Sequence, residues 1–223
     1  MSSDEAPYSI ASPASAIMVP ANGPMICTPS TRSVLASARI FTKPSVDAFA
    51  RESGLDHEHV IVEIFESREL DDYDRGRIGA EQFFEAIRSR LKIGMDAGKM
   101  RQLWDDIFRE NTPVADLIRR WHGMRPMFLI SNTCQSHVEQ FERQFDLFGL
   151  FRDRIYSCHV GLLKPEVEIY ELALNRFGVE ASKTLFVDDR PENIEGARKA
   201  GFYGVHFQGY EDFLRQVGAL GML

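Results

Sequence analysis

The sequence predicts an α/β protein, in which helices cover both faces of a parallel sheet and a long helical segment comes before the sheet. From about residue 124, short apolar runs that end in small polar residues alternate with segments of helical periodicity. This alternation is typical of a parallel sheet buried on both sides. Residues 45–123 carry helical patterns instead. The 223 residues suffice for one large domain, or for a core domain with a small insert.

The first 33 residues stand apart from the rest of the chain. They are rich in Ser, Ala and Pro, lack a helical period and carry few charges. Two short apolar pieces, residues 17–19 and 25–27, could form strands, although prolines lie close to both. We expect much of this segment to be loosely ordered.

Residues 45–123 show several amphipathic patterns. In the first of them, Ser45 is a candidate N-cap and Gly54 a stop signal. Farther on, apolar residues recur at helical spacing in three stripes, which we expect to be packed core rather than a cofactor-binding surface. The stripes comprise Phe83, Phe84, Ile87 and Leu91; Leu103, Trp104, Ile107 and Phe108; and Val114, Leu117, Ile118 and Trp121.

The second half of the chain alternates between strands and helices. Ligands of such sheets bind beyond the carboxyl ends of the strands. That rule places Ser131, Asn132, Asp188 and Asp189 at one rim of the sheet. The predicted strands lie within 125–132, 154–161, 183–189 and 202–207, and the predicted helices within 137–145, 166–178 and 191–201.

Composition limits the class of partner and the compartment. The net charge of −7 argues against nucleic acid or an anionic membrane as the main partner. No apolar run approaches the roughly 20 residues that span a bilayer, and the first residues do not resemble a secretory signal. Cys27, Cys134 and Cys158 form neither a CxxC pair nor a zinc spacing. We therefore expect a cytoplasmic protein with reduced thiols.

Two polar stretches near this rim are suited to phosphate. Ser131 and Asn132 offer a hydroxyl and an amide beside free backbone N–H groups, which makes either a phosphate cradle or an ordinary helix cap. Lys164 precedes Pro165, which we expect in the first turn of the next helix. The lysine ammonium could hold a phosphate oxygen, neutralise nearby carboxylates, or lie solvated at the surface.

The adjacent acids Asp188 and Asp189 follow a buried strand and precede a helix that Pro191 opens. Carboxylate oxygens, completed by water and substrate phosphate, suit Mg²⁺. The two acids could instead cap the helix, with Lys164 and backbone N–H groups satisfying their charge.

Taken in order, these stretches resemble the second, third and fourth motifs of the haloacid dehalogenase superfamily. The segments "LISNT", "GLLKPEVEIYELAL" and "LFVDDRPENIEGARKAGF" are similar to its phosphatases with a small helical cap. Such phosphatases include the amino-terminal domains of epoxide hydrolases and bacterial sugar-phosphate phosphatases. "YDRGRIGAEQFF" also resembles a cap segment. The resemblance covers about residues 45–215.

The resemblance implies a Rossmann-like parallel sheet with helices on both faces and a small helical cap inserted after the first strand. The cap would span 45–123 and the core 124–223, with segment 1–33 replacing or carrying the first strand. The implied reaction is Mg²⁺-dependent hydrolysis of a small phosphorylated metabolite through an aspartyl-phosphate. By this resemblance Ser131, Asn132 and Lys164 bind phosphate, and Asp188 and Asp189 bind the metal.

The first motif of the family, a strand ending in the nucleophilic aspartate, is not recognisable. The segment ahead of the cap offers Asp4, near the start of the chain, and Asp47, inside a helical pattern. Ser30 could replace the nucleophile, or Pro20 could stand there with Asn22 two residues on. Neither aspartate fits the first motif by its position, and none of Ser30, Pro20 and Asn22 can supply both an acyl phosphate and a metal-binding carboxylate. Losing a covalent nucleophile costs on the order of 10⁶-fold in kcat, so we expect negligible turnover by the family mechanism and weakened Mg²⁺ binding.

The sequence is compatible with several functions. The chain could be a non-catalytic member that still binds a phosphorylated ligand, an active phosphatase with an unconventional nucleophile, or a haloacid dehalogenase. It could also be a structural relic, and a shifted reading frame or wrong start could account for the missing motif. The sequence does not give the substrate, a protein partner or the oligomeric state.

Overall fold

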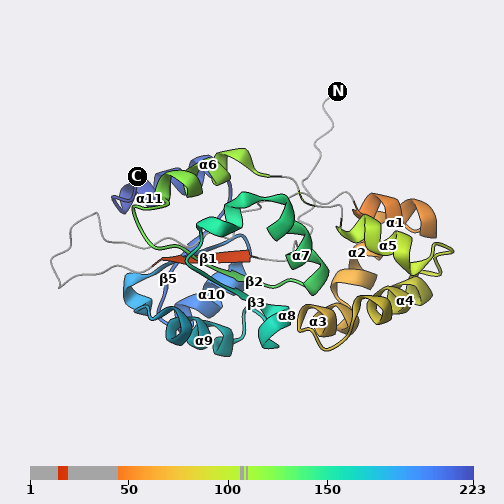
Figure 1. Cartoon of the computed structure of the whole chain (residues 1–223). Coiled ribbons are helices and arrows are strands. Elements are labelled where there is room, and N and C mark those ends of the chain that lie inside the picture. Colours follow the sequence, from red (N-terminus) through yellow and green to blue (C-terminus); the bar gives the residue numbers. More distant parts are fainter. Residues whose placement is uncertain (1–14, 20–44, 106–107, 109) are drawn as a thin grey trace, which may run out of the picture.

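A computed structural model describes residues 15–19, 45–105, 108 and 110–223 (Figure 1). Its five-stranded sheet has the order β3-β2-β1-β4-β5. β2 pairs with β3 and β4 with β5, both in parallel. The predicted α/β fold is therefore confirmed. The strands are β1 Ser15–Val19, β2 Phe128–Ser131, β3 Asp153–Tyr156, β4 Leu185–Asp188 and β5 Tyr203–His206.

The central strand β1 differs from the expected parallel arrangement, because it runs antiparallel to both neighbours. Ser15 pairs with Ser131 at the carboxyl end of β2, and Val19 pairs with Leu185 at the start of β4. A strand of either direction can satisfy the backbone groups of both neighbouring strands, so the central slot alone does not fix direction. The predicted strand at residues 17–19 is confirmed, and the second apolar piece lies outside the described residues.

Helices cover both faces of the sheet, with α6 and α11 on one side and α9 and α10 on the other (Figure 1). They pack with the strands into one hydrophobic cluster that includes Phe128, Tyr170 and Phe186. The elements around the sheet are α6 Thr112–Trp121, α7 Gln135–Gln144, α8 Ser157–Val160, α9 Val167–Phe177, α10 Pro191–Lys199 and α11 Tyr210–Ala219, with 3₁₀ helices Asp146–Leu150 and Ala181–Lys183.

A second hydrophobic cluster holds the remaining helices together. Its buried residues include Phe83, Phe84, Ile87 and Leu91 from the first predicted stripe and Trp104 from the second. Ile107 lies outside the described residues. These helices are α1 Ser45–Ser53, α2 His57–Phe65, α3 Arg68–Asp74, α4 Ala80–Leu91 and α5 Ala97–Asp105.

The third predicted stripe belongs to the sheet side of the molecule. Val114, Leu117, Ile118 and Trp121 of α6 are buried in the cluster that surrounds the sheet. Packing therefore favours a cap boundary before α6, earlier than residue 123, and the division of the chain into domains stays a prediction.

Candidate functional site

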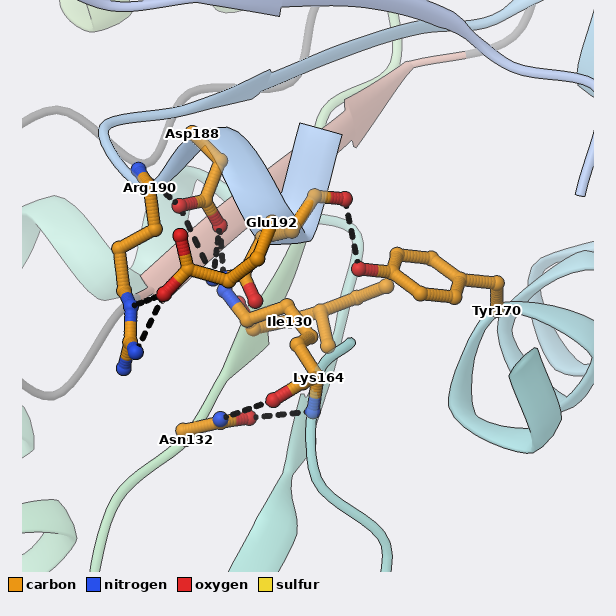
Figure 2. A network of polar contacts seen from close by, with 8 residues as sticks. Ile130, Asn132, Lys164, Tyr170, Asp188, Arg190 and Glu192 are labelled. Carbon is orange, nitrogen blue, oxygen red and sulfur yellow. Dashed lines mark hydrogen bonds and ion pairs between the residues drawn. The ribbon is translucent and has the colours of Figure 1, made fainter. Parts of the chain in front are cut away.

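The structure brings Asn132, Lys164 and Asp188 together at the carboxyl ends of β2 and β4 (Figure 2). Ser131 is the last residue of β2 and precedes Asn132 directly. β2 ends at Ser131 and β4 ends at Asp188, so the twisted sheet presents both at one rim. Lys164 reaches them from the loop between α8 and α9. All four residues are buried.

Lys164 and Asp188 form a buried ion pair. The ammonium Nζ lies 2.8 Å from Asp188 Oδ2, and both side chains are fully excluded from solvent. Nζ also donates to the carbonyl oxygen of Ile130 at 3.2 Å. Burial lowers the pKa of Lys164, and the Asp188 carboxylate opposes that shift. Lys164 is thus not a solvated surface lysine, and its ammonium meets the charge of Asp188, the acid that ends β4.

Both oxygens of Asp188 are occupied by protein donors. Oδ1 accepts from the Arg190 backbone N–H at 2.9 Å and from Asn193 Nδ2 at 3.0 Å. Oδ2 accepts from Lys164 and, at 3.1 Å, from the same Asn193 amide. Tyr170 Oη donates to the Asn193 carbonyl at 2.8 Å and ties α9 to α10 (Figure 2).

Sequence reasoning missed Asn193 and Tyr170. Asn193 stands in the first turn of α10, five residues after Asp188. An amide at that spacing from a strand-ending acid is the signal that could have found it, because the first turn of the helix folds back toward the strand end. The tyrosine hydroxyl carried no such signal, since its contact joins two different helices.

Asn132 holds the backbone of Lys164 in place. Its Nδ2 donates to the Lys164 carbonyl at 2.9 Å, and its Oδ1 accepts from the Lys164 N–H at 2.9 Å. Thr133 is fixed through its backbone by Ser157 Oγ, at 2.8 Å from the Thr133 N–H. Direct contact of Ser131 or Asn132 with phosphate stays a prediction.

Pro165 does not open a helix, contrary to the expectation from sequence. The Lys164–Pro165 peptide bond is cis, and the Glu166 N–H donates to the Leu163 carbonyl at 2.9 Å to close a turn. Helix α9 begins two residues later, at Val167. A proline ring is accommodated in such a turn as well as in a first helical turn, and the sequence pattern does not distinguish the two. Pro191, in contrast, does open α10 as predicted.

The described residues do not complete a divalent cation site. They include no group of three or more His, Cys, Asp or Glu side chains that could hold a metal ion. Asp189 is half-buried beside Asp188, but the Asp188 oxygens already accept from Lys164, Arg190 and Asn193. β1 has the sequence Ser-Ala-Ile-Met-Val and brings no acid to the central position.

The candidate nucleophile positions can be compared with the backbone register of β1. Asp4, Pro20, Asn22 and Ser30 lie outside the described residues. Val19 pairs with Leu185, so β1 ends at the edge of the sheet away from Asp188, which speaks against a nucleophile position directly after this strand. The only acid of the described chain ahead of residue 50 is Asp47 of α1, which is exposed and lies 2.7 Å from His57 Nε2.

A cavity of about 470 Å³ lies between the helices of the second cluster and the sheet unit. One wall is the segment between α3 and α4 and the other is the start of α7 together with α8. Its lining is mixed in polarity and includes Arg77, Arg101, Gln135, Glu139 and Cys158. Burial raises the pKa of the Cys158 thiol to about 12, so this group is not an activated nucleophile.

A family model of the haloacid dehalogenase-like hydrolases matches residues 109–201, the stretch that carries the Ser-Asn, Lys-Pro and Asp-Asp segments. This matched part, somewhat less than half of the chain, is similar to the haloacid dehalogenase-like hydrolases. Among the helices of the described residues, none is long and apolar enough to cross a membrane.

Several phosphatases are similar to this chain in sequence. Sesquiterpene phosphatase astK of Aspergillus oryzae is 24% identical over 145 residues, which are 64% of this chain and 74% of that protein. Fructose-1-phosphate phosphatase YqaB of Escherichia coli is 28% identical over 96 residues, 43% of this chain and about half of that protein, at 51%.

A solved structure supports the fold. A haloacid dehalogenase family enzyme of Bacteroides thetaiotaomicron, solved as a magnesium complex, matches with a TM-score of 0.67 and 19% identity. The match covers 79% of this chain and 92% of that one.

Proposed function

We propose that this chain binds a small phosphorylated metabolite at the rim formed by Ser131, Asn132, Lys164, Asp188 and Asp189. We further propose that it hydrolyses the phosphomonoester poorly or not at all. The buried Lys164–Asp188 pair, beside a central strand without an acid, is the observation that carries this proposal. The named activities of astK and YqaB support a phosphomonoester as the ligand class.

The phosphate-binding part of the proposal rests on a charge and on a hydroxyl. Lys164 supplies the ammonium, and Ser131 supplies a buried hydroxyl at the end of β2. A phosphate bound near Lys164 would compete with Asp188 for the lysine ammonium, which already pairs with that carboxylate. We therefore expect modest affinity for phosphate.

The impaired-turnover part rests on the missing carboxylate. An aspartyl-phosphate needs an aspartate in line with phosphorus, and Ser15–Val19 supplies none. The same carboxylate would be a metal ligand, so we expect Mg²⁺ to bind weakly through Asp188 and Asp189. No step of the proposed function depends on that ion.

Two measurements test the proposal together. Thermal unfolding in the presence of inorganic phosphate, a panel of sugar phosphates and MgCl₂ should show stabilisation by at least one phosphate compound. Release of phosphate from an aryl phosphate should stay at the background set by buffer and by the Asp188→Asn variant. Absence of any shift would remove the ligand-binding part.

An active phosphatase with an unconventional or misassigned N-terminus is the second candidate. The intact Ser-Asn, Lys-Pro and Asp-Asp segments favour it, because all three lie within the region matched by the family model. Phosphate release above background that Asp188→Asn abolishes would establish it over the first candidate. A haloacid dehalogenase remains a third candidate, and it needs the same missing aspartate.

A further inference from the structure

Helices α1–α5, which pack into the second hydrophobic cluster, are called the cap below. One ion pair joins the cap to the turn that carries Lys164. Arg75 follows α3, and its guanidinium makes a two-pronged contact with the Glu166 carboxylate. Arg75 Nη1 lies 3.0 Å from Glu166 Oε2 and also donates to the Gly161 carbonyl at 3.0 Å. The arginine side chain is 14% exposed and the glutamate 35%, so solvent screens this pair less than a surface pair.

Glu166 is at the same time part of the Lys164 turn. Its Oε2 accepts from the Leu163 N–H at 3.0 Å, and its own N–H donates to the Leu163 carbonyl at 2.9 Å. Lys164 is therefore enclosed in a short turn with two anchors. Asn132 holds it from the sheet side, and Arg75, through Glu166, holds it from the cap side.

The residue after Arg75 shows that this docking is close. Gly76 has φ +68, and a Cβ added there would overlap the backbone carbonyl oxygen of Cys158 in α8. A glycine is thus required for the backbone of the cap to rest against the backbone of the sheet unit at this point. A second contact lies nearby, where Tyr73 Oη lies 3.0 Å from Ser136 Oγ.

We propose that Arg75 and Glu166 form a latch that positions the turn of Lys164, so that docking of the cap sets the lysine for ligand binding. The contacts of Arg75 and Glu166 by themselves support a latch that holds residues 161–166. The effect of this latch on phosphate binding rests on the proposed function. Arg75 and Glu166 are positioning residues, because they act through Lys164. Coupling between elements of this kind commonly amounts to a factor of about 5–150.

The first readout is amide hydrogen exchange in the full chain, which requires no ligand. In Arg75→Met, the N–H groups of Leu163, Lys164 and Glu166 should exchange about fivefold faster or more, since the Glu166 carboxylate is then free to leave Leu163. Gly76→Ala should have the same effect without changing any charge.

The matched control is Arg90→Met, within the cap. Arg90 Nη2 lies 2.7 Å from Glu69, at 39% and 32% exposure, and both residues are on cap helices. This control should leave the exchange at residues 161–166 unchanged. Arg75→Lys keeps the positive charge and should recover part of the protection, which distinguishes an ionic latch from loss of packing.

The second readout is calorimetric titration with inorganic phosphate. Arg75→Met should weaken phosphate binding about tenfold relative to the wild type and to Arg90→Met. If Arg75→Met exchanges faster but the wild type binds no phosphate, the latch is upheld and the proposed function is refuted. Unchanged exchange at residues 161–166 in Arg75→Met, or an equal increase in Arg90→Met, would overturn the latch.

Discussion

Replacing Lys164 by methionine should destabilise the protein strongly, because it leaves the Asp188 carboxylate buried without its cation. Both side chains of the pair are fully excluded from solvent. Removing one partner of a buried pair costs about 3–5 kcal/mol. Asp188 keeps its contacts with the Arg190 N–H and the Asn193 amide, so we expect the lower end, about 3 kcal/mol. For a chain of this size that free energy corresponds to a fall in Tm of about 6–12 °C.

Lys183→Met is the matched control, because Lys183 Nζ also lies 2.8 Å from a carboxylate oxygen, that of Glu180. These side chains are 38% and 67% exposed, so the change should alter the free energy of unfolding by no more than about 0.5 kcal/mol. Both variants are compared with the wild type by urea unfolding at pH 7, followed by circular dichroism. A cost below about 1 kcal/mol for Lys164→Met would refute the assignment of a buried, charged pair.

Three further predictions concern the neighbours of this pair. Asn193→Ala removes the amide that donates to both carboxylate oxygens of Asp188. The free energy of unfolding in urea should fall by about 2 kcal/mol. Gly196→Ala places a Cβ 2.7 Å from the backbone oxygen of Pro165 and should lower the free energy of unfolding by about 1–3 kcal/mol. The control Gly149→Ala has open space around the new Cβ and should lower it by less than about 1 kcal/mol. Equal losses of stability in the two variants would contradict close packing at Gly196. The hydrogen-bonded Arg75 guanidinium lowers the pKa of Glu166, so that carboxylate contributes stability fully above pH 4.5 and loses it as the pH falls through the lowered value. The difference in unfolding free energy between wild type and Glu166→Gln should therefore be constant above that pH and shrink below it, and a difference that grows on acidification would contradict the pairing.

The layout of the sheet could be predicted because each strand carries a local signal. β2 and β4 are short apolar runs bounded by polar residues, and amphipathic helices follow them. Strands that run in the same direction bring their carboxyl ends to one edge of the sheet, and β2 and β4 do so although β1 lies between them. For this reason the sequence could place Ser131 and Asp188 at the same rim.

Direction and side-chain partners could not be predicted in the same way. The apolar run of β1 satisfies its neighbours in either direction, and nothing within its five residues encodes which one. The contact between Lys164 and Asp188 was one of three alternatives for that lysine, since burial of an ammonium depends on elements far apart in the chain. Arg75 and Glu166 are 91 residues apart, and each alone reads as a surface charge.

The charge at the rim bears on how tightly this chain could hold a phosphate. In a complete site of the superfamily, a divalent cation adds two positive charges and the nucleophile adds one negative charge, so the two together leave the site more positive by one unit. The proposed function has no such carboxylate and only weak metal binding, and in that case the ammonium of Lys164 faces Asp188 as a neutral pair. An incoming phosphate dianion must then share an ammonium that is already neutralised, in a setting where desolvating both partners is costly. Phosphate affinity should therefore depend on how firmly the turn holds Lys164 in reach, and this dependence makes the Arg75–Glu166 contact more consequential here than in a site where a metal ion holds the phosphate.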